Sequence, residues 1–134
     1  MPASGPKISV IIATYNWSSV LRSAIESALL QTFQDFELLV IGDGCTDDSD
    51  LVVRSFADPR VQWINLPSNS ASQATPNNHG ILMSAGEYIA YLGHDDVWYP
   101  THLESLLETA VRTVRTWWVR PRYSMDLRTP ACAR

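Results

Sequence analysis

Three features that identify many protein classes are missing from this sequence of 134 residues. Its two cysteines, Cys45 and Cys132, lie far apart without a CxxC spacing or a nearby histidine pair, which excludes a disulfide framework and a zinc site. Its six glycines form neither a P-loop nor a GxGxxG motif. No stretch reaches the ~18 to 20 apolar residues that span a bilayer, and residues 1–7 lack the apolar core of a signal peptide, so a cytoplasmic protein is expected.

Basic residues are scarce in most of the chain and concentrated near its end. Residues 1–111 contain 4 Lys or Arg against 13 Asp or Glu, whereas residues 112–134 contain 6 against 1. The composition, with 46% apolar and 18% charged residues, is typical of one globular domain. We therefore expect a folded domain in residues 1–111, followed by a segment of a different kind, and no nucleic-acid partner.

Residues 112–134 form a basic, aromatic tail with little periodicity, which includes Trp117 and Trp118. Lys or Arg combined with Trp is a composition found at membrane surfaces, so one interpretation is a peripheral membrane contact. The other interpretation is a non-native or disordered tail, and the lack of periodicity favours it.

The rest of the sequence alternates between strand and helix patterns. Residues 8–14 are a nearly continuous run of apolar, mostly β-branched residues, typical of a strand buried on both faces of a parallel sheet. Further strands are expected at residues 36–41, 61–66 and 87–92, and helices at residues 18–31, 51–56, 78–85 and 101–114. Residues 67–78 are expected to be a polar loop or a weakly structured lead-in to the next helix, with Pro76 in the first turn of that helix. The alternation predicts an α/β fold with a parallel sheet covered by helices on both faces.

Polar residues follow three of the four predicted strands, at residues 14–16, 42–44 and 94–96. Parallel α/β sheets bind ligands at the carboxyl ends of their strands. The convergence favours one binding site over three unrelated turns.

Two adjacent carboxylates, Asp95 and Asp96, come directly after the last predicted strand. Oxygen ligands of this kind suit Mg²⁺ or Mn²⁺, which binds through one or two carboxylates and completes its shell with phosphates and water. The pair therefore indicates a nucleotide diphosphate ligand. The alternative is a solvated turn, because Asp is common where strands end.

Four segments in register resemble the nucleotide-binding half of a family 2 glycosyltransferase with the Rossmann-like GT-A fold. They are residues 8–16, 24–33, 36–47 and 86–96. The resemblance covers residues 7–111 and is apparently incomplete. It implies an inverting, metal-dependent enzyme that uses Mn²⁺ or Mg²⁺ and transfers a sugar from a nucleotide-diphosphate sugar to the hydroxyl of an unknown acceptor. The donor that the resemblance implies is a UDP-sugar.

The resemblance also implies roles for the residues after the first two strands. Thr14 and Tyr15 match positions that line the base pocket, and Asn16 completes that nucleotide-binding segment. Asp43 matches the acid that accepts a hydrogen bond from a ring nitrogen of the base, a role that suits a carboxylate because it is only an acceptor. For Tyr15 the alternative is an aromatic ring that only covers the sheet edge.

After the last strand, Asp95 matches the final acid of the family's DxD motif and is expected to hold the metal, with Asp96 in support. His94 stands where it would contact the ribose or the metal, and its alternative is a histidine that caps the strand. Gly42 and Gly93 depart from the pattern, because many members of the family have Asp at these positions.

No residue can be assigned as the general base that activates the acceptor hydroxyl. Asp126 is the only acid after Glu108, and its surroundings do not resemble the family motif. A second hypothesis is therefore a non-catalytic nucleotide-binding fragment or inactive remnant of such an enzyme. A receiver or flavodoxin-like domain shares the alternation but expects other motifs. Self-association into a homo-oligomer is also expected, through an unpaired sheet edge.

Overall fold

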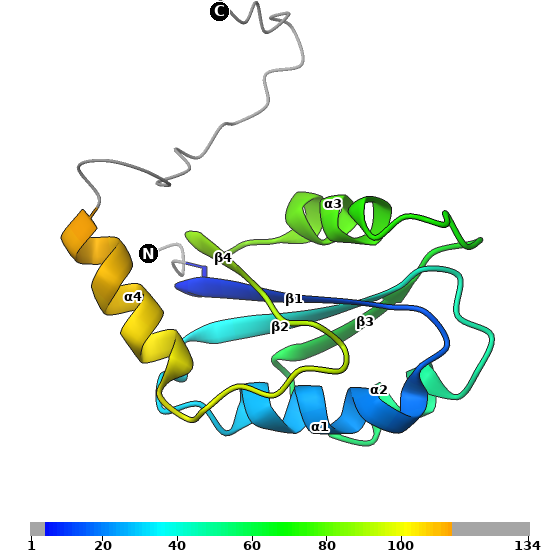
Figure 1. Cartoon of the computed structure of the whole chain (residues 1–134), viewed down its shortest axis with the longest axis horizontal. Coiled ribbons are helices and arrows are strands. Elements are labelled where there is room, and N and C mark those ends of the chain that lie inside the picture. Colours follow the sequence, from blue (N-terminus) through cyan, green and yellow to red (C-terminus); the bar gives the residue numbers. More distant parts are fainter. Residues whose placement is uncertain (1–4, 114–134) are drawn as a thin grey trace, which may run out of the picture.

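Four parallel strands form one sheet in the order β3-β2-β1-β4 in the computed structural model, which describes residues 5–113 (Figure 1). The strands are β1 (Ile8–Thr14), β2 (Phe36–Gly42), β3 (Val61–Asn65) and β4 (Tyr88–Tyr91). The helices are α1 (Ser18–Leu29), α2 (Ser49–Arg54), α3 (Ala74–Met83) and α4 (His102–Thr113). The predicted alternation of strands and helices is confirmed. The predicted tail lies almost entirely outside the described residues.

β1 lies inside the sheet, between β2 and β4, and all of its residues are buried. One face of β1 contributes Val10 and Ile12 to the larger core, which also contains Leu21 and Ile25 of α1. The other face contributes Ile11 to a smaller cluster that packs with Ile81 of α3. Burial on both faces explains why this strand has an unbroken apolar sequence.

Helices cover both faces of the sheet, as predicted. α1 and α2 lie along one face and α3 lies along the other (Figure 1). The approach of α3 is close, because a Cβ atom at Gly80 would lie 2.8 Å from a side-chain carbon of Ile11. Only glycine therefore lets this helix pack so near the strand.

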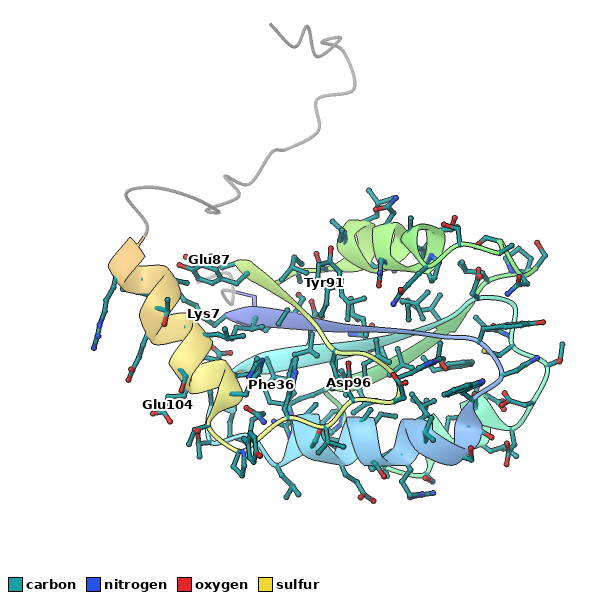
Figure 2. All side chains as sticks on the ribbon, in the orientation of Figure 1. Lys7, Phe36, Glu87, Tyr91, Asp96 and Glu104 are labelled. Carbon is teal, nitrogen blue, oxygen red and sulfur yellow. The ribbon has the colours of Figure 1, made fainter. Side chains whose placement is uncertain are left out.

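β4 pairs with only the first half of β1. Residues Ile8–Ile11 pair with Tyr88–Tyr91. An ion pair of 2.6 Å between Lys7 and Glu87 connects the chain just before both strands (Figure 2). Leu92 donates one more backbone hydrogen bond to the carbonyl of Ile11. The chain then turns away from β1.

α3 begins at Ala74, four residues before the predicted helix body, and Pro76 lies in its first turn as predicted. Pro76 occupies the first turn, where the missing N–H has no partner within the helix in any case. The polar composition of this turn hides it from a search for apolar periodicity. α2 also begins two residues earlier than predicted, at Ser49.

α4 begins next to Thr101, as predicted, but a distant residue supplies its capping bond. The side chain of buried Gln31 accepts a hydrogen bond of 2.9 Å from Leu103 N and donates one of 2.7 Å to Tyr99 O. Glu104, in the first turn of α4, accepts a hydrogen bond from Thr32 Oγ1. Among residues 5–113, no helix has the length and apolar character needed to cross a membrane.

Candidate functional site

A cavity of about 460 Å³ opens at the carboxyl edge of the sheet. Its wall consists of residues 13–15, 43, 69, 71–73, 76 and 93–95, which come from the ends of β1 and β2, the loop before α3, α3 itself and the turn after β4. The volume is in the range of small-molecule sites. Of the predicted site residues, the wall includes Thr14, Tyr15, Asp43, His94 and Asp95. Asn16 and Asp96 lie outside it.

Asp43 is the buried acid of the cavity, with 5% of its surface exposed. Its Oδ2 atom accepts hydrogen bonds from Asn69 Nδ2 at 3.2 Å and from Ser70 N at 3.1 Å. Its Oδ1 atom is also buried, but it receives no hydrogen bond from any residue between 5 and 113. A buried acceptor without a donor is costly, so this oxygen is suited to a donor from a ligand.

His94 is held in place from two sides. Its Nδ1 atom lies 3.0 Å from Oγ1 of buried Thr14, and its ring stacks on the indole of Trp17 with centroids 5.1 Å apart and planes 3° apart. Both contacts leave the Nε2 atom without a hydrogen bond to the described part of the chain. The ring can therefore present this nitrogen to a ligand. Trp17 was not predicted, because its stacking partner is far away in the sequence.

Asn16 binds the neighbouring loop and does not line the cavity. Its backbone has a positive φ of 50°, a conformation that asparagine tolerates better than most residues. Its Oδ1 atom accepts hydrogen bonds from the N atoms of Thr46 and Asp47, at 2.8 and 3.3 Å. These contacts position the loop after β2, and the predicted contact of Asn16 with nucleotide stays a prediction.

Asp47 connects this loop to two helices. Its carboxylate accepts hydrogen bonds from Ser18 N at the start of α1, and from Ser49 N and Ser49 Oγ at the start of α2. Burial alone would raise the pKa of Asp47, but the hydrogen bonds from Ser49 and Ser18 hold the pKa below its ordinary value of 3.8. The carboxylate thus fixes both helix starts beside the site.

Replacing Asp47 by alanine should lower the free energy of unfolding by about 1 to 2 kcal/mol, because three hydrogen bonds at two helix starts are lost. Urea unfolding at neutral pH measures the change. Asp48→Ala is the matched control, since Asp48 is exposed, and it should change stability by less than about 0.5 kcal/mol. The contribution of Asp47 is complete above its ordinary pKa and is lost as the pH falls through the lowered pKa. Equal stability losses in both variants would contradict this assignment.

Asp95 lines the cavity, whereas the carboxylate of Asp96 folds back over Gly93. Both acids are exposed. A Cβ atom at Gly93 would lie 2.3 Å from Asp96 Oδ2, so a larger residue at this position would require the exposed side chain of Asp96 to move. Within residues 5–113, no three His, Cys, Asp or Glu side chains are grouped to hold a metal by themselves.

The charge of the cavity wall is negative. Among residues 5–113, its charged side chains are Asp43 and Asp95, and it contains no Lys or Arg. A bound diphosphate would therefore meet carboxylates with no basic side chain to offset them. Exposed carboxylate oxygen is the donor type that Mg²⁺ and Mn²⁺ prefer, so the wall fits a cation that arrives with an anionic ligand.

The model of glycosyl transferase family 2 matches residues 9–130 of this chain. The chain belongs to glycosyl transferase family 2. The cavity lies within the residues that match the family model, and the resemblance found in the sequence is confirmed.

Curated relatives of this chain come from several bacteria. An uncharacterized glycosyltransferase of Rickettsia typhi is 35% identical over 99 residues, which are 74% of this chain and 30% of the relative. The uncharacterized glycosyltransferase YibD of Escherichia coli is 36% identical over 113 residues, which are 83% of this chain and 32% of the relative. The chain therefore spans about a third of the length of these relatives.

Solved structures have the same fold. S. aureus TarS 1–349 is 25% identical with a TM-score of 0.75, over 79% of this chain and 32% of that one. Its complex with UDP-GlcNAc has a TM-score of 0.74 at 24% identity, covering 79% of this chain and 31% of that one. The mannosyltransferase PcManGT from Pyrobaculum calidifontis, in complex with GDP-Man and Mn²⁺, has a TM-score of 0.64 at 22% identity, covering 83% and 33%. The expected GT-A fold is confirmed.

Proposed function

We propose that the chain forms the donor-binding part of a transferase that moves a sugar from a nucleotide-diphosphate sugar to an acceptor hydroxyl, in an inverting, metal-dependent reaction. The observation that carries the proposal is the buried Oδ1 atom of Asp43, which receives no hydrogen bond from residues 5–113 and shares one cavity with Asp95. Asp43 Oδ1 fits an N–H group of a base, and Asp95 fits the cation and phosphate end of the same ligand.

The base would bind at the end of β2, where Asp43 accepts a hydrogen bond from a ring N–H. Uracil carries such a group at N3, and complexes of TarS contain UDP and UDP-GlcNAc, which supports a uridine nucleotide. Tyr15, which is 45% exposed and lines the same wall, would pack against the base. Thr14 would complete this side of the pocket.

The diphosphate would bind near the turn after β4. Asp95 would hold Mn²⁺ or Mg²⁺, Asp96 would support it, and His94 would direct its Nε2 atom at the ribose or phosphates. A bound cation offsets the charge that develops on the departing nucleotide diphosphate. The lack of a three-ligand group among the described residues means that phosphate oxygens would have to complete the coordination. The complex of PcManGT with GDP-Man and Mn²⁺ supports the use of a divalent cation.

The acceptor hydroxyl needs a carboxylate base, and the described residues offer no candidate. Within residues 5–113, Asp43 and Asp95 are the carboxylates of the cavity wall, and both have binding roles. This observation favours a second candidate function for this chain alone, which is nucleotide-sugar binding without transfer.

Titration calorimetry with UDP, in the presence and absence of Mn²⁺, tests the proposed function. Binding should be about 10- to 100-fold tighter with Mn²⁺, because the cation removes the repulsion between the diphosphate and Asp95. ADP is the control ligand, since adenine has no ring N–H for Asp43, and it should bind about tenfold more weakly than UDP. The absence of heat with any nucleotide diphosphate would reject the proposal.

A further inference from the structure

The loop before α3 holds the carboxylate of Asp43 from one side. Oδ2 has three donors within reach: Asn69 Nδ2 at 3.2 Å, Ser70 N at 3.1 Å and Ser70 Oγ at 2.9 Å. The hydroxyl of Ser70 also lies 2.9 Å from Ser72 O, and it can donate to one acceptor at a time. The N–H of Ser70 and the amide of Asn69 act only as donors toward Oδ2. This oxygen must therefore remain an acceptor.

The orientation of these donors is fixed by the backbone around them. Asn69 Oδ1 accepts a hydrogen bond of 2.9 Å from Ala71 N, so the amide nitrogen has to face Asp43. Gly44 has a φ of 73°, and a Cβ atom there would lie 2.4 Å from Asn69 N. The loop thus packs directly against the residue that follows Asp43. The carboxylate has little freedom to exchange its two oxygens.

We propose that Asn69 and Ser70 are positioning residues that determine the base specificity of the site, an inference that rests on the proposed function. They engage Oδ2, and they leave Oδ1 as a single buried acceptor for the ligand. Such a site requires a ring N–H, which uracil has at N3. Cytosine has a lone pair at its N3 atom, which would face Oδ1 acceptor to acceptor, and one unmade bond to a buried charge costs about 1.5 to 3 kcal/mol.

The same geometry reverses the preference in the Asp43→Asn variant. The amide oxygen of asparagine has to take the place of Oδ2, because Ser70 N and Asn69 Nδ2 remain donors. The amide nitrogen then takes the place of Oδ1 and presents a donor to the base. Cytosine N3 accepts this hydrogen bond, whereas the N3–H of uracil is opposed to it.

The affinities of UDP and CDP, measured by calorimetry with Mn²⁺, test the inference. The wild-type protein should prefer UDP by about tenfold or more, and Asp43→Asn should prefer CDP. The double variant N69A/S70A, which keeps only the backbone donor, should lower the UDP preference by about tenfold. Ser68→Ala is the matched control, because Ser68 is exposed on the same loop outside the cavity wall, and it should keep the wild-type ratio.

Two results would overturn the inference while leaving the proposed function intact. One is a preference of Asp43→Asn for UDP, and the other is a wild-type ratio in N69A/S70A. Because the asparagine side chain has the shape of the aspartate that it replaces, the first variant is not expected to disturb the fold. A wild-type protein that binds neither UDP nor CDP would overturn the proposed function together with the inference.

Discussion

Replacing Asp43 by alanine should weaken UDP binding by about 10- to 100-fold, because a hydrogen bond to a charged acceptor contributes about 1.5 to 3 kcal/mol. The factor should be the same with and without Mn²⁺, since Asp43 serves the base and not the diphosphate. Calorimetry under both conditions measures it. Asp48→Ala, which removes an exposed carboxylate from the neighbouring loop, should bind UDP as the wild-type protein does.

Loss of UDP binding only in the presence of Mn²⁺ would contradict this assignment, because it would place Asp43 at the metal end of the ligand. A similar loss in Asp48→Ala would indicate a general effect of charge rather than a specific bond. Thermal unfolding of both variants shows whether the protein remains folded.

The second large effect is expected from Asp95→Ala, which should remove the Mn²⁺-dependent gain in UDP affinity almost completely. Asp95 is exposed, lies in the turn after β4 and lines the cavity. Without its carboxylate the cation would have phosphate and water ligands only. UDP without metal should bind the variant at least as well as it binds the wild-type protein, because a repelling charge is gone.

The electron paramagnetic resonance signal of Mn²⁺ provides a readout of Asp95 that is independent of heat. For the wild-type protein the signal of free Mn²⁺ should fall only after UDP is added, because no three-ligand group exists within residues 5–113. In Asp95→Ala the signal should stay close to that of a Mn²⁺ and UDP mixture. Asp96→Ala is the comparison, and its smaller loss should reflect a supporting role. A full Mn²⁺ effect in Asp95→Ala would reject the metal assignment.

The order of elements could be predicted from the sequence because each strand and most helices carry a local pattern. The unbroken apolar run of β1 and the turn residues around it are properties of neighbouring positions. The position of Pro76 in the first turn of α3 could be predicted, whereas the exact start at Ala74 was missed because this turn is polar. The capping of α4 could not be predicted, because Gln31 reaches it from far away in the sequence.

The candidate site shows the same division between local and distant information. Asp43, His94 and Asp95 could be predicted because each comes shortly after the end of a strand. The parallel sheet brings these strand ends to one edge. The roles of Trp17 and Ser70 depend on contacts with partners that are 77 and 27 positions away. Such contacts leave no periodic signal in a single sequence, so only the folded chain identifies them.

The order β3-β2-β1-β4 also explains why the cavity lies where it does. From β1 the chain winds outward to β3, and then it crosses back to place β4 on the other side of β1 (Figure 1). The turn after β4 reaches the end of β1 from one side, where His94 contacts Thr14, and the loop after β3 reaches Asp43 from the other side. The cavity lies between this turn and this loop, at the carboxyl edge of the sheet. The location of the cavity is thus a property of connectivity, so substitutions in its wall can change which ligand binds without changing where it binds.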